Sequence, residues 1–165
     1  MFNAQTYHAP WGKSLRWASA LTVGICIFVP VMILNSVPKN SAARWTGFLV
    51  ASILVGAALF TVRRYTIEPR FLAIQRLLWT TRLPLAGLQS ATVMPKAMSR
   101  SIRLCGNGGA FSFTGWFRNR DLGVYRAFVT DLNRTVVLKF AKRTVVISPD
   151  RPEEFVAEIM TTANI

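Results

Sequence analysis

Two long apolar runs without a charged residue dominate the first part of the chain. They cover residues 17–34 and 45–62. As an α-helix, each run would be roughly 27 Å long, close to the thickness of the hydrocarbon core of a bilayer. A signal peptide would explain only the first run, and a second apolar run follows it at once instead of a cleavage site and a soluble domain. A buried core helix would explain only the second run. The pattern therefore predicts two transmembrane helices.

The segments that flank the two runs predict a hairpin and its orientation. Residues 35–44 form a short polar connector with one proline, as a turn outside the bilayer requires. The connector holds the cations Lys39 and Arg44. Because Lys and Arg are enriched on the cytoplasmic side of membrane proteins, a larger number of cations outside the hairpin predicts that both termini are cytoplasmic. The cations on these outer flanks are Lys13, Arg16, Arg63, Arg64, Arg70 and Arg76.

Beyond the second run the pattern changes to short apolar runs that are rich in β-branched and aromatic residues. Turn-forming residues such as Pro84, Gly87 and Pro95 separate them. This spacing is typical of strands in an antiparallel meander. The runs expected to form strands are 71–74, 77–81, 88–94, 102–104, 126–130, 135–141 and 143–148.

An amphipathic helix is expected at the end of the chain. Asp150 can cap it, with Pro152 in the first turn and Glu153 three residues after the cap. The apolar side chains that would share one face are Phe155, Val156, Ile159 and Met160. About seven strands followed by one such helix predict an α+β membrane protein, in which a small bent β-barrel follows the transmembrane hairpin and the helix covers one open end.

Several stretches of the soluble part resemble the bacterial pleckstrin-homology-like (PH-like) domain family. After the two-helix hairpin the chain reads YTIEPRFLAIQR, then GNGG…GWF…LGVYRAFVTD, and then VVISPDRPEEFVAEI. The resemblance spans residues 65–163 and implies the same bent sheet with a C-terminal helix, in a small multi-pass protein of the bacterial inner (plasma) membrane. It implies neither a catalytic residue nor a ligand. The expected parts are a cytoplasmic tail at 1–16, the hairpin at 17–62 and a cytoplasmic PH-like domain at 63–165.

The stretch from Gly106 to Phe128 combines glycines, aromatic residues and arginines, and it allows three interpretations. A phosphate-binding loop is disfavoured because neither a lysine followed by serine or threonine nor a helix pattern follows the glycines. Base stacking on nucleic acid would suit these residue types, but a membrane-anchored domain rarely meets that partner. The favoured interpretation is a pair of strands joined by an elaborate loop, with Gly106, Gly108 and Gly109 at positive φ angles.

The same stretch holds the candidate contact residues. Phe111 and Phe113 alternate with Ser112, as in a half-buried strand. An aromatic pair followed by cations is expected to form a wedge at the tip of the loop, where it can contact a partner or the membrane surface. The candidates are Trp116, Phe117, Arg118, Arg120 and Arg126.

The net charge of +13 suggests a second surface, next to the bilayer. Cations near an anionic leaflet gain on the order of 1 kcal/mol each. The arginines after the second helix could therefore hold the domain against the membrane, or they could do no more than set the topology. Both interpretations remain open. These juxtamembrane arginines are Arg63, Arg64, Arg70 and Arg76.

The residue types of an enzyme do not come together in this sequence. His8, the one histidine, lies in the N-terminal tail, and Cys105 has no histidine to pair with in the domain. Asp121 and Asp131 are expected in turns or ion pairs. Neither a metal site nor a cofactor is predicted, and Cys105 is not expected to form a disulfide with Cys26.

The sequence therefore predicts a non-enzymatic, membrane-anchored PH-like interaction or scaffold protein. Such a protein could be an accessory subunit or assembly factor of an inner-membrane complex, bound to another membrane protein or to further copies of itself. The alternative is a sensor of anionic membrane lipid that uses the basic, aromatic face of the domain.

Overall fold

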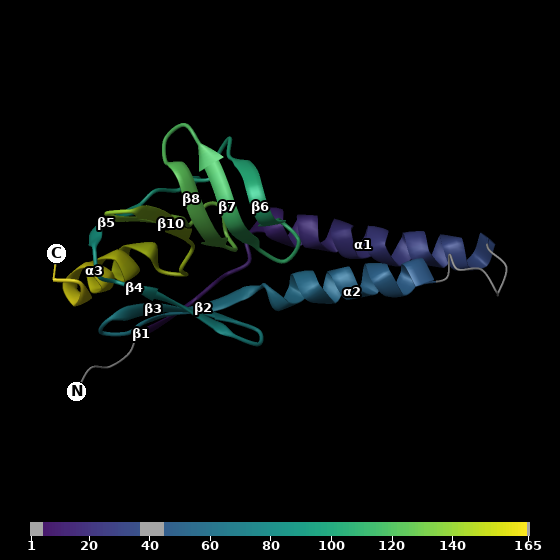
Figure 1. The fold of residues 1–165 in the computed structure, drawn as a ribbon, viewed down its shortest axis with the longest axis horizontal. Helices are drawn as coiled ribbons and strands as arrows, with labels where there is room; N and C mark the ends of the chain where they lie inside the picture. Colours follow the sequence, from purple (N-terminus) through teal and green to yellow (C-terminus); the bar gives the residue numbers. More distant parts are fainter. Residues whose placement is uncertain (1–4, 37–44, 165) are drawn as a thin grey trace.

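The computed structural model describes residues 5–36 and 45–164. In this part of the chain, two helices lie side by side and project from a β-rich domain (Figure 1). The connector predicted for residues 35–44 falls outside the described residues except for its first two positions, which end the first helix.

Helices α1 (Lys13–Ser36) and α2 (Trp45–Leu59) correspond to the two apolar runs. Among the described helices, α1 is the one long and apolar enough to cross a membrane. Helix α2 has 15 residues, or about 22 Å, and ends before the predicted limit of the second span. The reason is that Val62 belongs to a strand and is fully buried in the domain core. An apolar side chain suits lipid and protein core equally, so the apolar run continues past the end of the helix.

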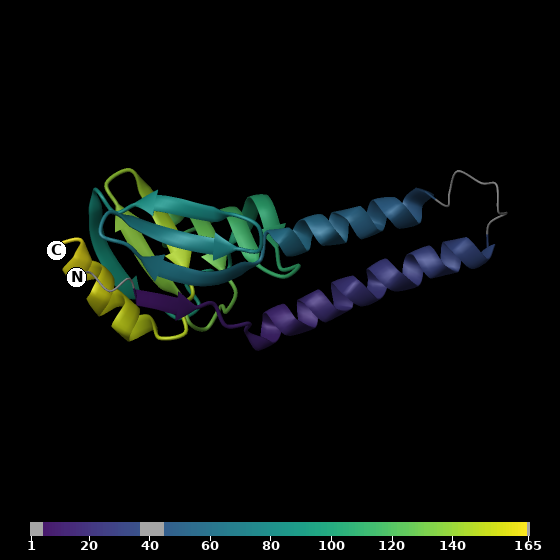
Figure 2. The ribbon, with the colours of Figure 1, turned by 90° about the horizontal axis from the view of Figure 1, so that it is seen from below.

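The chain enters and leaves the helical pair through two strands of a four-stranded antiparallel sheet. Its strands lie in the order β1 (Gln5–His8), β2 (Val62–Ile67), β3 (Phe71–Arg76) and β4 (Thr80–Pro84). Strand β1 comes from the segment that the sequence pattern assigned to a tail. In Figure 2 it lies beside β2; β1 leads through residues 9–12 into α1, and α2 leads through residues 60–61 into β2. The helical pair is therefore inserted between two neighbouring strands of one sheet.

A six-stranded sheet forms the second layer of the domain. Its order is β5 (Leu88–Val93), β9 (Val136–Phe140), β10 (Arg143–Ile147), β8 (Gly123–Val129), β7 (Phe113–Asn119) and β6 (Ile102–Gly108). Strands β8 and β10 are parallel, whereas the other neighbours are antiparallel. The prediction of a meander closed into a barrel was therefore wrong for the described strands, which form two sheets. Turn signals indicate that β9 and β10 form a hairpin, but they do not specify the parallel pairing of β10 with β8 on its other side.

The main core lies between the two sheets and the C-terminal helix α3 (Pro152–Thr162). Phe155 and Ile159 of α3 are fully buried in this core, which confirms the predicted amphipathic helix. The predicted cap was wrong: Arg151 is the N-cap residue and makes no capping hydrogen bond with its side chain. The carboxylate of Asp150 instead accepts the N–H of Arg151 at 3.1 Å. A second apolar cluster, which includes Phe117, covers the other face of the six-stranded sheet.

Tyr65 fastens the core of the domain by hydrogen bonds. Its hydroxyl donates to the carbonyl oxygen of Phe128 at 2.6 Å and accepts the N–H of Ser148 at 3.2 Å. Burial raises the pKa of Tyr65 to about 12, because the phenolate would lose its hydration inside the core. This tyrosine thus joins β2 of the first sheet to β8 of the second.

Candidate functional site

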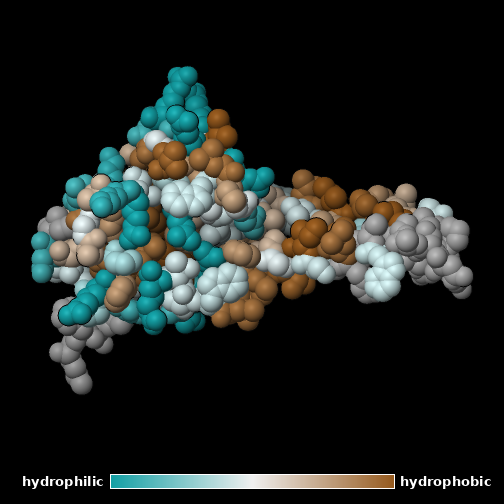
Figure 3. All heavy atoms as spheres, in the orientation of Figure 1, coloured by the Kyte–Doolittle hydropathy of each residue, from teal (hydrophilic) through white to brown (hydrophobic). Residues whose placement is uncertain are grey.

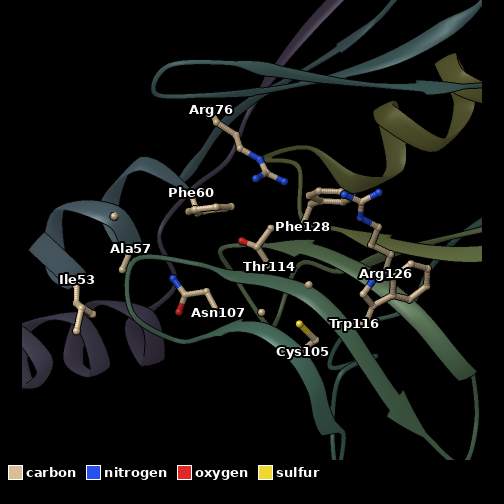
Figure 4. A pocket seen from close by; sticks show the side chains of 13 residues that line it. Ile53, Ala57, Phe60, Arg76, Cys105, Asn107, Thr114, Trp116, Arg126 and Phe128 are labelled. Atoms are coloured by element: carbon tan, nitrogen blue, oxygen red, sulfur yellow. The ribbon is translucent and has the colours of Figure 1, made fainter.

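A pocket of about 430 Å³ opens where the end of α2 meets the exposed end of the six-stranded sheet (Figure 4). One wall is the last part of α2 with Phe60, and the opposite wall is the face of β7 and β8. Trp116 pairs across the strands with Arg126, and Thr114 pairs with Phe128, so these four side chains share one face of the sheet. Most of the lining is apolar, but two arginines reach into it.

Arg76, the last residue of β3, turns its side chain inward and is only 9% exposed. Its guanidinium carbon lies 5.4 Å from the ring centre of Phe60, 5.4 Å from that of Trp79 and 5.2 Å from that of Phe128. The Nε atom is buried and has no hydrogen-bond partner among the described residues. Burial lowers the pKa of Arg76, and the nearby charge of Arg126 lowers it further. A guanidinium nevertheless keeps its proton in proteins, so this is a buried positive charge.

Arg126 supplies the second positive charge of the pocket. Its guanidinium carbon lies 4.9 Å from the ring centre of Phe128, the same ring that Arg76 contacts. Figure 4 shows both guanidinium groups near this ring. Within the described residues, the carboxylates that form ion pairs do so with other arginines: Glu68 with Arg82, Asp131 with Arg134, and Asp150 and Glu154 with Arg151. The two pocket arginines therefore repel each other without an acidic neighbour to balance them.

Two facing glycines let β6 and β7 approach closely at the pocket wall. Gly106 and Gly115 pair across the strands and have φ angles of 114° and 140°. A Cβ atom on Gly106 would lie 2.3 Å from the carbonyl oxygen of Thr114, and one on Gly115 would lie 2.2 Å from that of Cys105. Positive φ angles also occur at Gly109 but, contrary to the prediction, not at Gly108.

The turn between β6 and β7 packs on the base of the helical pair. The N–H of Phe111 donates to the hydroxyl of Ser19 in α1 at 2.9 Å, and the hydroxyl of Ser112 donates to the carbonyl oxygen of Phe60 at 3.3 Å. Ser112 is fully buried, whereas Phe111 is half-buried and has a φ angle of 66°. The prediction of a half-buried strand through Phe111 and Phe113 was wrong for Phe111, which lies in the turn, where the buried position is taken by Ser112. Phe113 does belong to β7 and packs against the second apolar cluster.

The predicted wedge of aromatic residues does not form. Trp116 and Phe117 are neighbours within β7, so their side chains point to opposite faces of the sheet. Trp116 is 45% exposed at the pocket, whereas Phe117 is 4% exposed and stacks on Tyr125 with ring centres 6.1 Å apart. Arg118 is exposed in β7, and Arg120 is exposed in the turn that follows. Of the candidate contact residues, the fold thus brings Trp116 and Arg126 to the pocket.

The juxtamembrane arginines also separate. Arg63 and Arg64 are exposed in β2, close to the end of α2, and Arg70 is exposed in the turn after β2. Arg76 is the member of this group that lines the pocket. Its burial had a signal in the sequence, since Leu72, Ile74 and Arg76 alternate along β3 and therefore point to the same side.

The cysteines are free thiols, with Cys26 half-buried in α1 and Cys105 exposed at the pocket. Within residues 5–36 and 45–164, His, Cys, Asp and Glu side chains do not gather in a group of three or more that could hold a metal ion.

Because the pocket combines two arginines with a mostly apolar lining, it is suited to bind an anion through its arginines and an apolar group through the rest of its lining.

The fold and the pocket together define the class of this protein. It is a small two-sheet β domain, closed by a C-terminal helix and joined to an apolar helical pair, with a cationic and aromatic pocket at the junction. A family model of the bacterial PH domain matches residues 63–163, more than half of the chain. The chain therefore belongs to the bacterial PH domain family, which confirms the resemblance seen in the sequence. Comparisons with curated proteins and with solved structures found no match.

Proposed function

We propose that this protein is a non-enzymatic, membrane-anchored interaction module, an accessory subunit or assembly factor of a bacterial inner-membrane complex. In this proposal α1 and α2 both cross the membrane, and the PH-like domain and both termini lie in the cytoplasm. The partner is another protein of the same membrane.

Insertion of the helical pair is supported by its exposed apolar surface. In the most apolar 18-residue window of α1, only 6% of the residues are buried. Apolar side chains such as Trp17, Leu21 and Phe28 in α1 and Ile53 in α2 are exposed. In Figure 3, apolar atoms are prominent along the two helices, whereas hydrophilic atoms are frequent on the domain. Helices that are apolar on their outward sides need an apolar surrounding, and a bilayer provides one. A helix as short as α2 can cross where the bilayer thins locally.

The open edge of β6 is the observation that carries the interaction role. Strand β6 is the last strand of its sheet and pairs with β7 alone among the described strands. Ile102 and Leu104 are 70% and 54% exposed along it. An edge with free backbone groups and exposed apolar side chains is a template for an added strand. Arg103 and Arg118 lie close to this edge, which favours an acidic partner segment over a basic one.

Purification from the native membrane tests this function. The full-length protein with a C-terminal tag is extracted gently and analysed by native mass spectrometry. A defined set of membrane subunits should accompany it and should be lost from a variant that combines Ile102→Lys with Leu104→Lys. The control Leu78→Lys changes an equally exposed apolar residue in the connection between β3 and β4, and it should keep the complex. If the wild-type protein emerges as a monomer or as a homo-oligomer, the accessory-subunit role is refuted.

A second candidate function is recognition of anionic lipid through charge at the leaflet surface. Arg63 and Arg64 are exposed and follow α2 within a few residues, where an inserted helix would hold them close to the headgroups. In full-length protein reconstituted into vesicles, these arginines should then be modified chemically more slowly when the vesicles contain anionic lipid, because the lipid headgroups cover them. Equal modification in anionic and zwitterionic vesicles would refute this function.

A further inference from the structure

We infer that the pocket between α2 and the face of β7 and β8 binds a single anionic membrane lipid. The acidic headgroup lies between Arg76 and Arg126, and the start of an acyl chain follows α2 toward the bilayer. This inference goes beyond partner binding at β6. It rests on insertion of the helical pair, which is part of the proposed function, but not on the identity of a partner protein.

The headgroup site is supported by the two unbalanced arginines. A guanidinium presents five N–H donors, but Arg76 is nine-tenths buried, its neighbours are aromatic rings, and its Nε has no acceptor among the described residues. The rings compensate part of the lost hydration through their electron-rich faces. A buried charge without a partner is otherwise unfavourable. Arg126 adds repulsion from a second positive charge, and an anion from outside the chain that lies between the two guanidinium groups would relieve this repulsion and supply acceptors.

The apolar half of the pocket is supported by the spacing of residues along α2. Ile53, Gly56, Ala57 and Phe60 line the pocket, and the first three share one face of the helix. This lining extends about 10 Å along the direction of the helix. At Gly56, a Cβ atom would meet nothing within 4 Å, so the helix surface is open at this point. Ile53 is itself exposed to the surroundings of the helix. The pocket thus opens onto the surface of a helix that lies in lipid in our proposal.

The combination of the two halves selects the class of ligand. A free phosphate would satisfy the arginines but leave the apolar lining beside α2 uncovered. An apolar peptide would cover that lining but leave two arginines without a counterion. The volume of about 430 Å³ suits a headgroup and the first part of a chain, and the rest of the chain would remain in the bilayer. Trp116 is 45% exposed at the pocket and pairs across the strands with Arg126, so its indole ring can contact a headgroup held by that arginine.

Lipid titration of the full-length protein in detergent tests this inference, with bound lipid counted by native mass spectrometry. The probes are phosphatidylglycerol, phosphatidylcholine with the same chains, and glycerol phosphate, which has the acidic headgroup without chains. We expect one phosphatidylglycerol per chain, bound about tenfold or more tightly than either of the other two probes. If phosphatidylcholine binds as well as phosphatidylglycerol, the arginines do not select the ligand. If glycerol phosphate binds as well, the site is a phosphate site. Either outcome overturns the inference.

Three variants locate the binding site. Arg126→Gln should weaken phosphatidylglycerol about tenfold or more, because it removes one of the two charge-assisted contacts. Gly56→Leu should weaken it by filling the open side of α2 while both arginines remain. The control Arg120→Gln removes the same charge from an exposed position in the turn after β7, outside the pocket, and should change the affinity by about twofold or less. Wild-type affinity in both Arg126→Gln and Gly56→Leu would overturn the proposed site.

The lipid site and the partner site can fail separately. Loss of lipid in Arg126→Gln with the membrane subunits still attached would support the lipid site independently of β6. Retention of lipid in the Ile102→Lys and Leu104→Lys variant, with the subunits lost, would show that partner binding needs the edge strand and not the pocket. If wild-type protein lacks partners but retains one phosphatidylglycerol, the lipid inference stands and the accessory-subunit role falls.

Discussion

Replacement of Arg76 by methionine should have opposite effects on stability with and without anionic lipid. Methionine has a similar length and can pack against the same rings of Phe60, Trp79 and Phe128, but it carries no charge. Replacing buried ionic groups by apolar residues is often neutral or stabilising by about 1–4 kcal/mol. Loss of the cation–π contacts offsets part of this gain, by about 2 kcal/mol for a cation as buried as Arg76. Without lipid, we therefore expect Arg76→Met to stabilise the domain by up to about 2 kcal/mol.

With the lipid present, the wild type should become the more stable of the two proteins. A ligand at a hundred times its Kd stabilises the folded state by about 2.7 kcal/mol, and Arg76→Met should lose this gain together with the headgroup site. For a chain of this size, 1 kcal/mol corresponds to a change in Tm of about 2–4 °C. Thermal unfolding is followed by tryptophan fluorescence in a nonionic detergent, first without lipid and then with added phosphatidylglycerol.

Two results would refute this reasoning. If Arg76→Met has a lower Tm than the wild type in lipid-free detergent, the aromatic rings satisfy the charge and the arginine is structural. If phosphatidylglycerol raises the Tm of both proteins equally, the stabilising lipid binds elsewhere. The control Arg118→Met removes an exposed charge from β7, so its Tm should stay close to that of the wild type in both conditions.

Two further predictions concern the scaffold that holds the pocket. Tyr65→Phe should lower the free energy of unfolding by about 1–3 kcal/mol, since it leaves the N–H of Ser148 without its acceptor in the core; urea unfolding of the variant measures this. The wild type should also lose stability between pH 10 and about 12, where the unfolded chain releases the tyrosine proton and the folded chain retains it, and equal slopes in wild type and variant would contradict this. Gly115→Ala should cost about 3 kcal/mol or more, because the methyl group would collide with the backbone of β6, whereas the control Gly123→Ala, at a φ of 67° with open space around it, should cost only about 1 kcal/mol. Equal unfolding midpoints for these two glycine variants would show that the strands separate easily.

Local patterns in the sequence identified the elements that depend on local chemistry. The apolar face with Phe155 and Ile159 predicted the C-terminal helix, and short runs of β-branched and aromatic residues between turn residues predicted most of the later strands. Strand β1 was missed because it is only four residues long and Tyr7 is its one buried side chain. A single inward residue gives no measurable period, and the strand forms because β2 is available as a neighbour.

The pocket could not be assembled from the sequence, although three of its residues, Arg76, Trp116 and Arg126, were on the candidate lists. Arg76 was assigned to the membrane surface and Arg126 to a loop tip, and these groups were interpreted separately. Their proximity depends on how the two sheets pack around Phe128, which no spacing along the chain specifies. Gly56 and Phe60 were assigned entirely to a membrane span, since no pattern along the chain indicates that the helix end also faces the domain.

The insertion of the helical pair between β1 and β2 restricts how the domain can move. A domain on a single linker can rotate about that linker, but here two covalent attachments enter neighbouring strands that are hydrogen-bonded to each other. Two further hydrogen bonds hold the segment between β1 and α1. The N–H of Gly12 donates to the carbonyl oxygen of Thr130 at 3.0 Å, and the N–H of Ala9 donates to the carbonyl oxygen of Arg63 at 3.0 Å. Rotation about the membrane normal would require both helices to turn together. With the pair inserted in a bilayer, the edge of β6 would therefore keep a constant distance from the membrane surface and a constant orientation relative to the helices. A neighbour in the same membrane could reach this edge only from the side that it faces.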